Sequence, residues 1–184
     1  MKILLSEICD PVKDFYSMRW KKKKEIVFFA FIPFLLGILF LVCDVFLSPV
    51  RFFDLDEFIS DMLNQLVTVL TLFISFSMAY LSILITSGSS NVDDLKRKES
   101  GEYSLEKGDR KVTLYQVLMD EITYTLIVEI GFLLFIFFQK FLYLLCKGWV
   151  LKILIAIDIS FLVHVLLLMV VTVKNIYFSF WRSK

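Results

Sequence analysis

The chain has 184 residues and a net charge of +1, and hydrophobic residues make up 58% of it, with 20 phenylalanines among them. A soluble domain of this length cannot bury so much apolar surface, because small domains have a high ratio of surface to volume. The cysteines form no CxxC pair, which argues against a zinc site. Cys43 and Cys146 fall near the same predicted membrane face, so a disulfide between them stays open. We expect a membrane protein without a cofactor.

The N-terminal segment, residues 1–25, alternates apolar and charged positions. This pattern is typical of an amphipathic helix that lies at a membrane interface, here with a break predicted at Pro11. The segment ends in a group of basic residues, namely Arg19, Lys21, Lys22, Lys23 and Lys24. We interpret them as determinants of topology, and also as candidates to face anionic lipid headgroups.

Four apolar stretches are long enough to cross a bilayer, which takes about 20 helical residues. They cover residues 26–47, 62–86, 122–145 and 150–173. The first is longer than the apolar core of a cleaved signal peptide and lacks a small-residue cleavage site, so we expect it to remain as an anchor. The sequence thus predicts an all-α fold, a four-helix bundle in the membrane that forms one domain over residues 1–184.

Basic residues are distributed unevenly between the two predicted sides. Segments 1–25, 87–118 and 174–184 carry sixteen of them, and the other side carries four. Since cytoplasmic loops are enriched in Lys and Arg, both termini are predicted to lie in the cytoplasm. We expect a multi-pass protein of the bacterial inner membrane, with a cytoplasmic loop over residues 87–118 and a cytoplasmic tail over 174–184.

The second span carries a polar stripe at spacings that place its members on one helical face. The members are Asn64, Thr68, Thr71, Ser75, Ser82 and Thr86. Small hydroxyl residues let membrane helices approach closely, which favours a packing role. A face that lines a pore or contacts another subunit is the alternative.

The loop after this span mixes charges of both signs. Ser90 or Asn91 is a candidate N-cap for a short helix through Lys98. The loop is nearly neutral, which argues against direct binding of nucleic acid. A solvated loop is one interpretation, and a docking surface for a soluble protein is the other. The candidate docking residues are Lys96, Arg97, Lys98, Arg110 and Lys111.

Three ionisable residues, Glu129, Asp158 and His164, lie within the third and fourth spans. Such residues usually face other helices or water. Glu129 and His164 are predicted at a similar depth, so a contact between them would satisfy two buried polar groups. Asp158 is expected to face another helix or a subunit axis. An interhelical hydrogen bond and a site that responds to protons or ions are both open.

The sequence contains no motif of an enzyme active site, such as HExxH, GxSxG or GxxxxGK[ST], so we expect no enzymatic activity. The layout of four spans, the lysine-rich N-terminal approach and the stretch from Ile83 to Lys96, ILITSGSSNVDDLK, resemble the small membrane subunit of the Kiwa anti-phage defence system. The resemblance implies a homo-oligomeric sensor of phage attack in the inner membrane, with a soluble, DNA-associated partner recruited at its cytoplasmic face.

The sequence therefore leaves two hypotheses for function. The first is a non-enzymatic membrane sensor or scaffold that forms a homo-oligomer, with a tetramer as the expected number, and docks a cytoplasmic effector. The second is an ion-conducting pore, motivated by the polar stripe and the ionisable residues. Because polar groups gather on the second, third and fourth spans, we expect the first span to face lipid more, and the other three to form the bundle interior or the subunit contacts.

Overall fold

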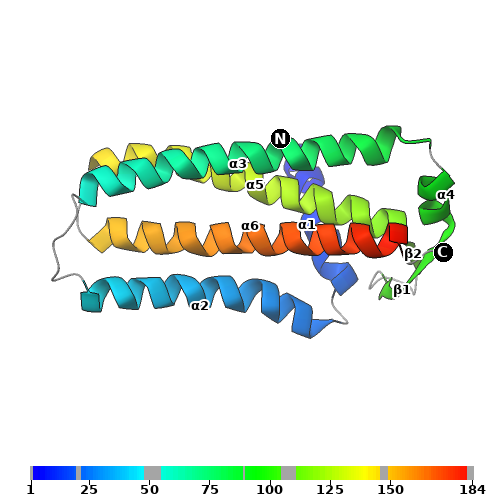
Figure 1. Ribbon diagram of the computed structural model, residues 1–184, viewed down its shortest axis with the longest axis horizontal. Helices are drawn as coiled ribbons and strands as arrows, with labels where there is room; N and C mark the ends of the chain where they lie inside the picture. The colour runs from blue at the N-terminus through cyan, green and yellow to red at the C-terminus, as the bar shows by residue number, and fades with distance from the viewer. Residues whose placement is uncertain are drawn as a thin grey trace.

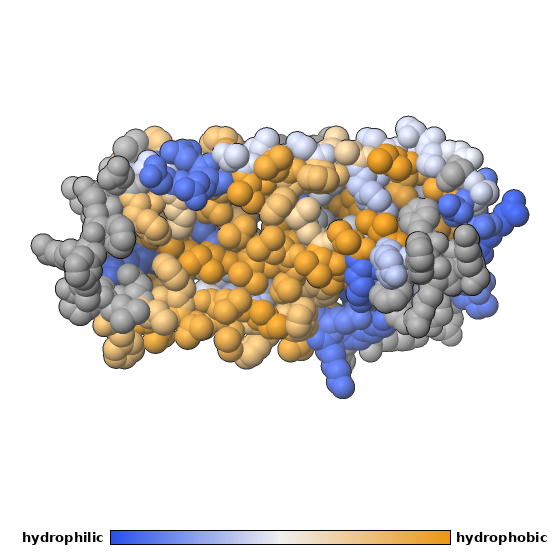
Figure 2. Space-filling model, viewed as in Figure 1, coloured by the Kyte–Doolittle hydropathy of each residue, from blue (hydrophilic) through white to orange (hydrophobic). Residues whose placement is uncertain are grey.

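Four long helices dominate the computed structural model, which describes residues 2–19, 22–47, 55–88, 90–104, 111–145 and 149–181. The four are α2 (Lys23–Leu47), α3 (Leu55–Thr86), α5 (Leu114–Leu145) and α6 (Trp149–Trp181). Each is long and apolar enough to cross a membrane, and each contains one of the predicted spans. Figure 2 shows apolar side chains over the middle of these helices and hydrophilic ones towards the two ends.

The long helices pack as an open row in the order α2, α6, α5, α3 (Figure 1). Helix α6 lies between α2 and α5, and the main neighbour of α3 is α5. Helices α5 and α6 bury the largest shares of their spans, and α3 buries a smaller share than α2. Which of the two outer helices faces lipid depends on subunit contacts, so the expectation that the first span faces lipid more than the others stays a prediction. Both ends of the row are open, so α3 has an uncovered face in spite of its polar residues.

Helix α2 lies against α6 along a face of small residues. A Cβ atom on Gly37 would overlap the Ser160 hydroxyl and would come within 2.7 Å of the Ala156 carbonyl oxygen. Small residues at such a crossing let two membrane helices approach closely. The position of Gly37 therefore fixes where α2 and α6 meet.

A second group of elements gathers towards one end of the long helices, where α3 ends and α5 begins, and we call it the platform (Figure 1). It consists of α1 (Lys2–Arg19), α4 (Ser90–Arg97), β1 (Glu99–Ser104) and β2 (Lys111–Thr113). Helix α1 runs across the long helices and contacts α5, β1 and α2. The predicted break at Pro11 is wrong, because α1 continues through it. A proline removes one helical hydrogen bond, and the tertiary contacts of the following turns hold the helix in place.

The segment between α3 and α5 is folded rather than a simple loop. Helix α4 buries Val92 and Leu95, and Leu95 packs in one apolar cluster with Leu84 of α3 and Leu118 of α5. The short helix predicted here is confirmed, but it already begins at Ser90. The capping position therefore precedes Ser90 and Asn91 and lies outside the described residues.

Strands β1 and β2 pair antiparallel, with Glu99 opposite Thr113. Their presence modifies the all-α expectation, although the strands are short. Thr113 then caps α5 in a reciprocal pair: its hydroxyl accepts from the Gln116 amide at 3.2 Å, and its own amide donates to the Gln116 side chain at 3.0 Å. This T-x-x-Q capping box explains why α5 begins at Leu114.

Candidate functional site

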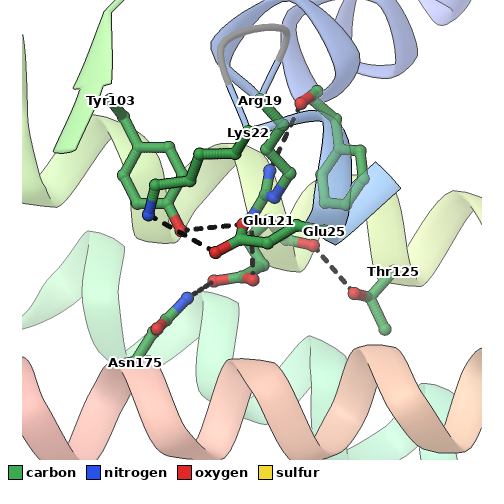
Figure 3. Close-up of polar contacts among 8 residues, drawn as sticks. Arg19, Lys22, Glu25, Tyr103, Glu121, Thr125 and Asn175 are labelled. Atoms are coloured by element: carbon green, nitrogen blue, oxygen red, sulfur yellow. Dashed lines mark hydrogen bonds and ion pairs between the residues drawn. The ribbon is translucent and has the colours of Figure 1, made fainter. Parts of the chain in front are cut away.

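A buried ion pair connects the platform to the long helices. Arg19 is the last residue of α1, and its Nη2 donates to Glu121 Oε1 of α5 at 2.9 Å. The Asn175 side chain of α6 donates to the other carboxylate oxygen at 2.7 Å (Figure 3). Arg19 and Glu121 are 1% and 0% exposed. Because a buried charge is tolerated only when it is paired, each partner here requires the other.

Aromatic rings complete the surroundings of the arginine. The guanidinium lies 3.8 Å from the centre of the Phe15 ring and 5.3 Å from that of Tyr103 in β1. Lys22 lies over the same Tyr103 ring at 4.3 Å and pairs with Glu25 at 3.4 Å. Burial raises the pKa of the Tyr103 phenol above its ordinary value, against the opposing effect of the Arg19 charge. The phenol therefore stays neutral and donates to Glu25 at 3.5 Å.

Through these contacts one side chain connects four elements. Arg19 belongs to α1 and contacts α5 directly, β1 through Tyr103, and α6 through the shared carboxylate of Glu121. A movement of α1 relative to α5 would therefore break the ion pair between Arg19 and Glu121, or would carry α5 along with it. We call Arg19, Glu121 and Asn175 the latch.

The latch corrects one sequence-based assignment. Arg19 was predicted to face lipid, but it is buried because α1 turns this residue towards α5. Lys22 is half-buried and paired with Glu25, whereas Lys24 is exposed as expected. Lys21 and the side chain of Lys23 lie outside the described residues.

A second series of hydrogen bonds crosses from α2 through α6 to α5, farther from the platform than the latch. Pro33 has no amide hydrogen, so the carbonyl of Phe29 lacks its helical donor. The Nδ1 atom of His164 lies 3.0 Å from that carbonyl oxygen, and its Nε2 lies 3.4 Å from the Tyr124 hydroxyl. A carbonyl only accepts, so Nδ1 carries the proton and Nε2 accepts from Tyr124. The histidine thus supplies the donor that the proline removes.

The predicted contact between Glu129 and His164 is wrong. Glu129 accepts a hydrogen bond from Ser77 of α3 at 3.2 Å, while His164 contacts Tyr124. Glu129 follows Tyr124 by five residues, which is a rotation of about 140° around α5. Glu129 therefore faces α3, and Tyr124 faces α6.

Asp158 lies in the interface between α5 and α6, where the Gln139 side chain donates to it at 2.8 Å. Both side chains are buried. The expectation that Asp158 faces another helix agrees with this contact. Together with Glu121–Asn175 and Tyr124–His164, it makes a third polar contact along the α5–α6 interface, and such contacts fix helix register.

The polar stripe of α3 points away from the other helices of the chain. Its members Asn64, Thr68, Thr71, Ser75, Ser82 and Thr86 are all exposed. The five hydroxyl groups donate to backbone carbonyls four residues earlier on α3, at 2.7 to 3.1 Å. Asn64 also accepts from Lys140 of α5 at 2.7 Å. Within one chain the packing role is therefore limited to the Asn64 end of the stripe.

The candidate docking residues that the structure describes lie on the outside of the platform. Lys96 pairs with Asp93 at 3.9 Å, and Arg97 and Lys98 are exposed. Lys111 pairs with Glu99 at 2.7 Å, and this hydrogen bond and the charge of Glu99 raise the pKa of Lys111. Arg110 lies outside the described residues, as does Cys146, so the pairing of Cys146 with Cys43 is not described either.

Sequence reasoning missed several residues of these contacts. Among them are Ser77, Glu121, Tyr124, Thr125, Gln139 and Asn175. Some signal was present for Glu121 and Asn175, because a carboxylate and an amide at the same end of antiparallel spans are natural partners. Ser77 carried no signal, since it lies off the stripe.

Among the described residues, no group of three His, Cys, Asp or Glu side chains is placed to hold a metal ion. No protein-family model, curated protein or solved structure matches this chain. The geometry of the latch, the platform and the interhelical contacts is therefore the basis for a functional conclusion.

Proposed function

We propose that this chain is a non-enzymatic membrane sensor and scaffold that presents the platform to a soluble effector protein. The observation that carries the proposal is the latch, which joins α1 of the platform to α5 and α6 through a buried ion pair. A purely solvated segment between α3 and α5 would not need to bury Leu95 of α4 against Leu84 and Leu118. A docking surface would, because its geometry must follow that of the spans.

In this proposal the platform lies in the cytoplasm of a bacterial cell, at the inner membrane. The support is the excess of basic residues in segments 1–25, 87–118 and 174–184, compared with the segments on the other side of the four spans. Reporter fusions test the orientation: a C-terminal fluorescent protein should be bright, and a C-terminal alkaline phosphatase should be inactive. The opposite pattern would place the platform outside the cytoplasm.

The docking partner is proposed to contact the exposed basic residues of the platform. Lys96, Arg97 and Lys98 follow one another at the end of α4 and are exposed. Reversing all three charges to Glu should abolish co-purification of the effector from detergent, while Lys13→Glu on α1 serves as a matched control with an exposed lysine on the same platform. If the triple variant still retains its partner, the docking surface lies elsewhere.

Self-association is the third part of the proposal, through the exposed face of α3. The stripe gives this face small side chains whose hydroxyls are already bonded to their own backbone, so a second copy can approach closely without leaving them unpaired. A tetramer is the expected assembly. Ser75→Leu should shift the mass measured by native mass spectrometry towards the monomer, and an unchanged mass would exclude this face as the contact.

The biological role that we propose is defence against phage, as the resemblance of the Ile83–Lys96 segment to the Kiwa membrane subunit suggests. Cells that express the chain together with its effector should then plate phage at reduced efficiency. The triple charge reversal at Lys96, Arg97 and Lys98 should restore plating. Protection that persists in that variant would separate the role from docking at this surface.

A further inference from the structure

A cavity of about 130 Å³ lies between α3, α5 and α6, close to the platform end of the row. Apolar side chains form most of its wall, and Phe76 and Val173 lie at its open side, where they are 67% and 63% exposed. Both belong to segments that are long and apolar enough to cross a membrane. The cavity therefore opens towards lipid rather than towards water.

Two hydroxyl groups in the cavity wall have no hydrogen-bond partner among the described residues. They are Tyr80 Oη of α3 and Thr172 Oγ1 of α6, and both atoms are buried. The other two hydroxyls of the wall are already used, since Ser77 donates to Glu129 and Thr125 donates to the Glu121 carbonyl. Buried hydroxyls are normally paired, so two unpaired hydroxyls beside one cavity indicate that an acceptor binds there once these side chains turn towards it.

The depth of these hydroxyls restricts what the acceptor is. The spanning part of α3, Phe58–Thr86, has 29 residues, or about 43 Å of helix, which matches the roughly 40–45 Å of a bilayer with its headgroups. The hydrocarbon layer is about 30 Å thick, so its edge lies about 6–7 Å inside the helix end. Tyr80 is six residues from that end, about 9 Å, and Thr172 is about 7.5 Å from Tyr177 at the end of its own span. The backbone of both residues therefore lies near the edge of the hydrocarbon layer, which is close to the depth of lipid ester groups.

We propose that this cavity binds the acyl-ester region of a bilayer phospholipid. An ester carbonyl accepts hydrogen bonds from Tyr80 and Thr172, and the acyl chain leaves along Phe76 and Val173 into the bilayer. A carbonyl oxygen has two lone pairs, so one ester satisfies both donors. The site goes beyond the proposed function, because it needs no effector and no second copy of the chain.

The lipid site adjoins the latch. Thr125 in its wall donates to the Glu121 backbone, and two further wall residues, Ile122 and Ile176, directly follow Glu121 and Asn175. A bound ester therefore supports the helix surfaces that position the carboxylate and the amide for Arg19. Loss of the lipid should loosen the platform.

The test compares two lipids that differ only in the proposed acceptor. The purified full-length chain in detergent is titrated with a diester phosphatidylglycerol or with its diether analogue of equal chain length, and the shift of the thermal unfolding midpoint gives an apparent affinity. The diester should bind more tightly. Tyr80→Phe and Thr172→Val should each reduce that preference roughly five-fold, which is the loss of about one hydrogen bond.

Thr123→Val is the matched control, because its hydroxyl lies on α5 outside the cavity wall and already donates to the Met119 carbonyl of its own helix. It should keep the full preference for the diester. Equal affinity of the unaltered chain for the two lipids would overturn the proposal. It would equally fail if Tyr80→Phe lowered the midpoint by the same amount in both lipids, as water in the cavity would predict. If Tyr80→Phe and Thr172→Val left the unfolding midpoint unchanged or raised it in both lipids, the two hydroxyls would bind no lipid and the proposal would fail.

Discussion

Removing the arginine of the latch should detach α1 from the long helices and should strongly lower the free energy of unfolding. Arg19→Met keeps much of the apolar length of the side chain and removes only its charge and its donors. Glu121 is then left buried, with Asn175 as its remaining side-chain donor. Breaking a buried ion pair in this way is destabilising by about 3–5 kcal/mol.

The chain offers a matched control on the same helix. Lys13 pairs with Asp10 at 3.5 Å, but their side chains are 68% and 60% exposed. An exposed pair contributes about 0–1 kcal/mol, so Lys13→Met should have little effect. The two variants remove one cation each from α1, and the predicted difference of about 3 kcal/mol reflects burial alone.

Unfolding by sodium dodecyl sulfate in mixed micelles, followed by circular dichroism, measures both variants under the same conditions. The double variant Arg19→Met/Glu121→Leu should be less destabilised than the sum of the two single variants, because it leaves no unpaired buried charge. If Arg19→Met and Lys13→Met differed by less than about 0.5 kcal/mol, the buried pair would not hold the platform. Additive single and double variants would refute the reasoning as well.

Three further variants test the contacts between the long helices by the same measurement. Gly37→Ala should be destabilising by about 1–3 kcal/mol, because its Cβ would overlap α6, whereas Gly131→Ala, with open space around it, should be neutral or stabilising by up to about 1 kcal/mol. His164→Leu should be destabilising by about 1–3 kcal/mol, and should lose most of that effect in a Pro33→Ala background, where the restored amide donates to the same carbonyl; an equal effect in both backgrounds would contradict the proline–histidine pairing. Gln139→Leu leaves a buried carboxylate unpaired and should be destabilising by about 1–3 kcal/mol, and a neutral result would mean that this carboxylate has another donor.

The spans could be predicted from the sequence because their signal is local. A run of apolar residues long enough to cross a bilayer has few alternatives to a helix, since its backbone groups must be paired within the segment. All four runs are indeed inside helices. The T-x-x-Q box before α5 is equally local, since both partners lie within four residues, but it was not among the predictions.

The latch could not be predicted in the same way, because its parts lie 102 and 54 positions apart in the chain. The group from Arg19 to Lys24 looks uniform in sequence, and only the docking of α1 on α5 separates its first member from the rest. The rotation of α5 was equally hidden. Depth along a span follows from counting residues, but the face that a residue presents depends on which neighbour the helix finds.

The arrangement of polar contacts explains how a change in the bilayer would reach the platform. Helix α5 makes polar side-chain contacts with both of its neighbours in the row, α3 and α6. Its contributing residues are Glu121, Tyr124, Glu129, Gln139 and Lys140. These contacts resist sliding, because each slid register would leave a buried polar group unpaired. The platform end is different, since there the lining of the lipid-facing cavity continues directly into the latch. On the proposal that this cavity binds lipid, we expect a change in lipid packing at that depth to act on the position of α1 rather than on the register of the spans.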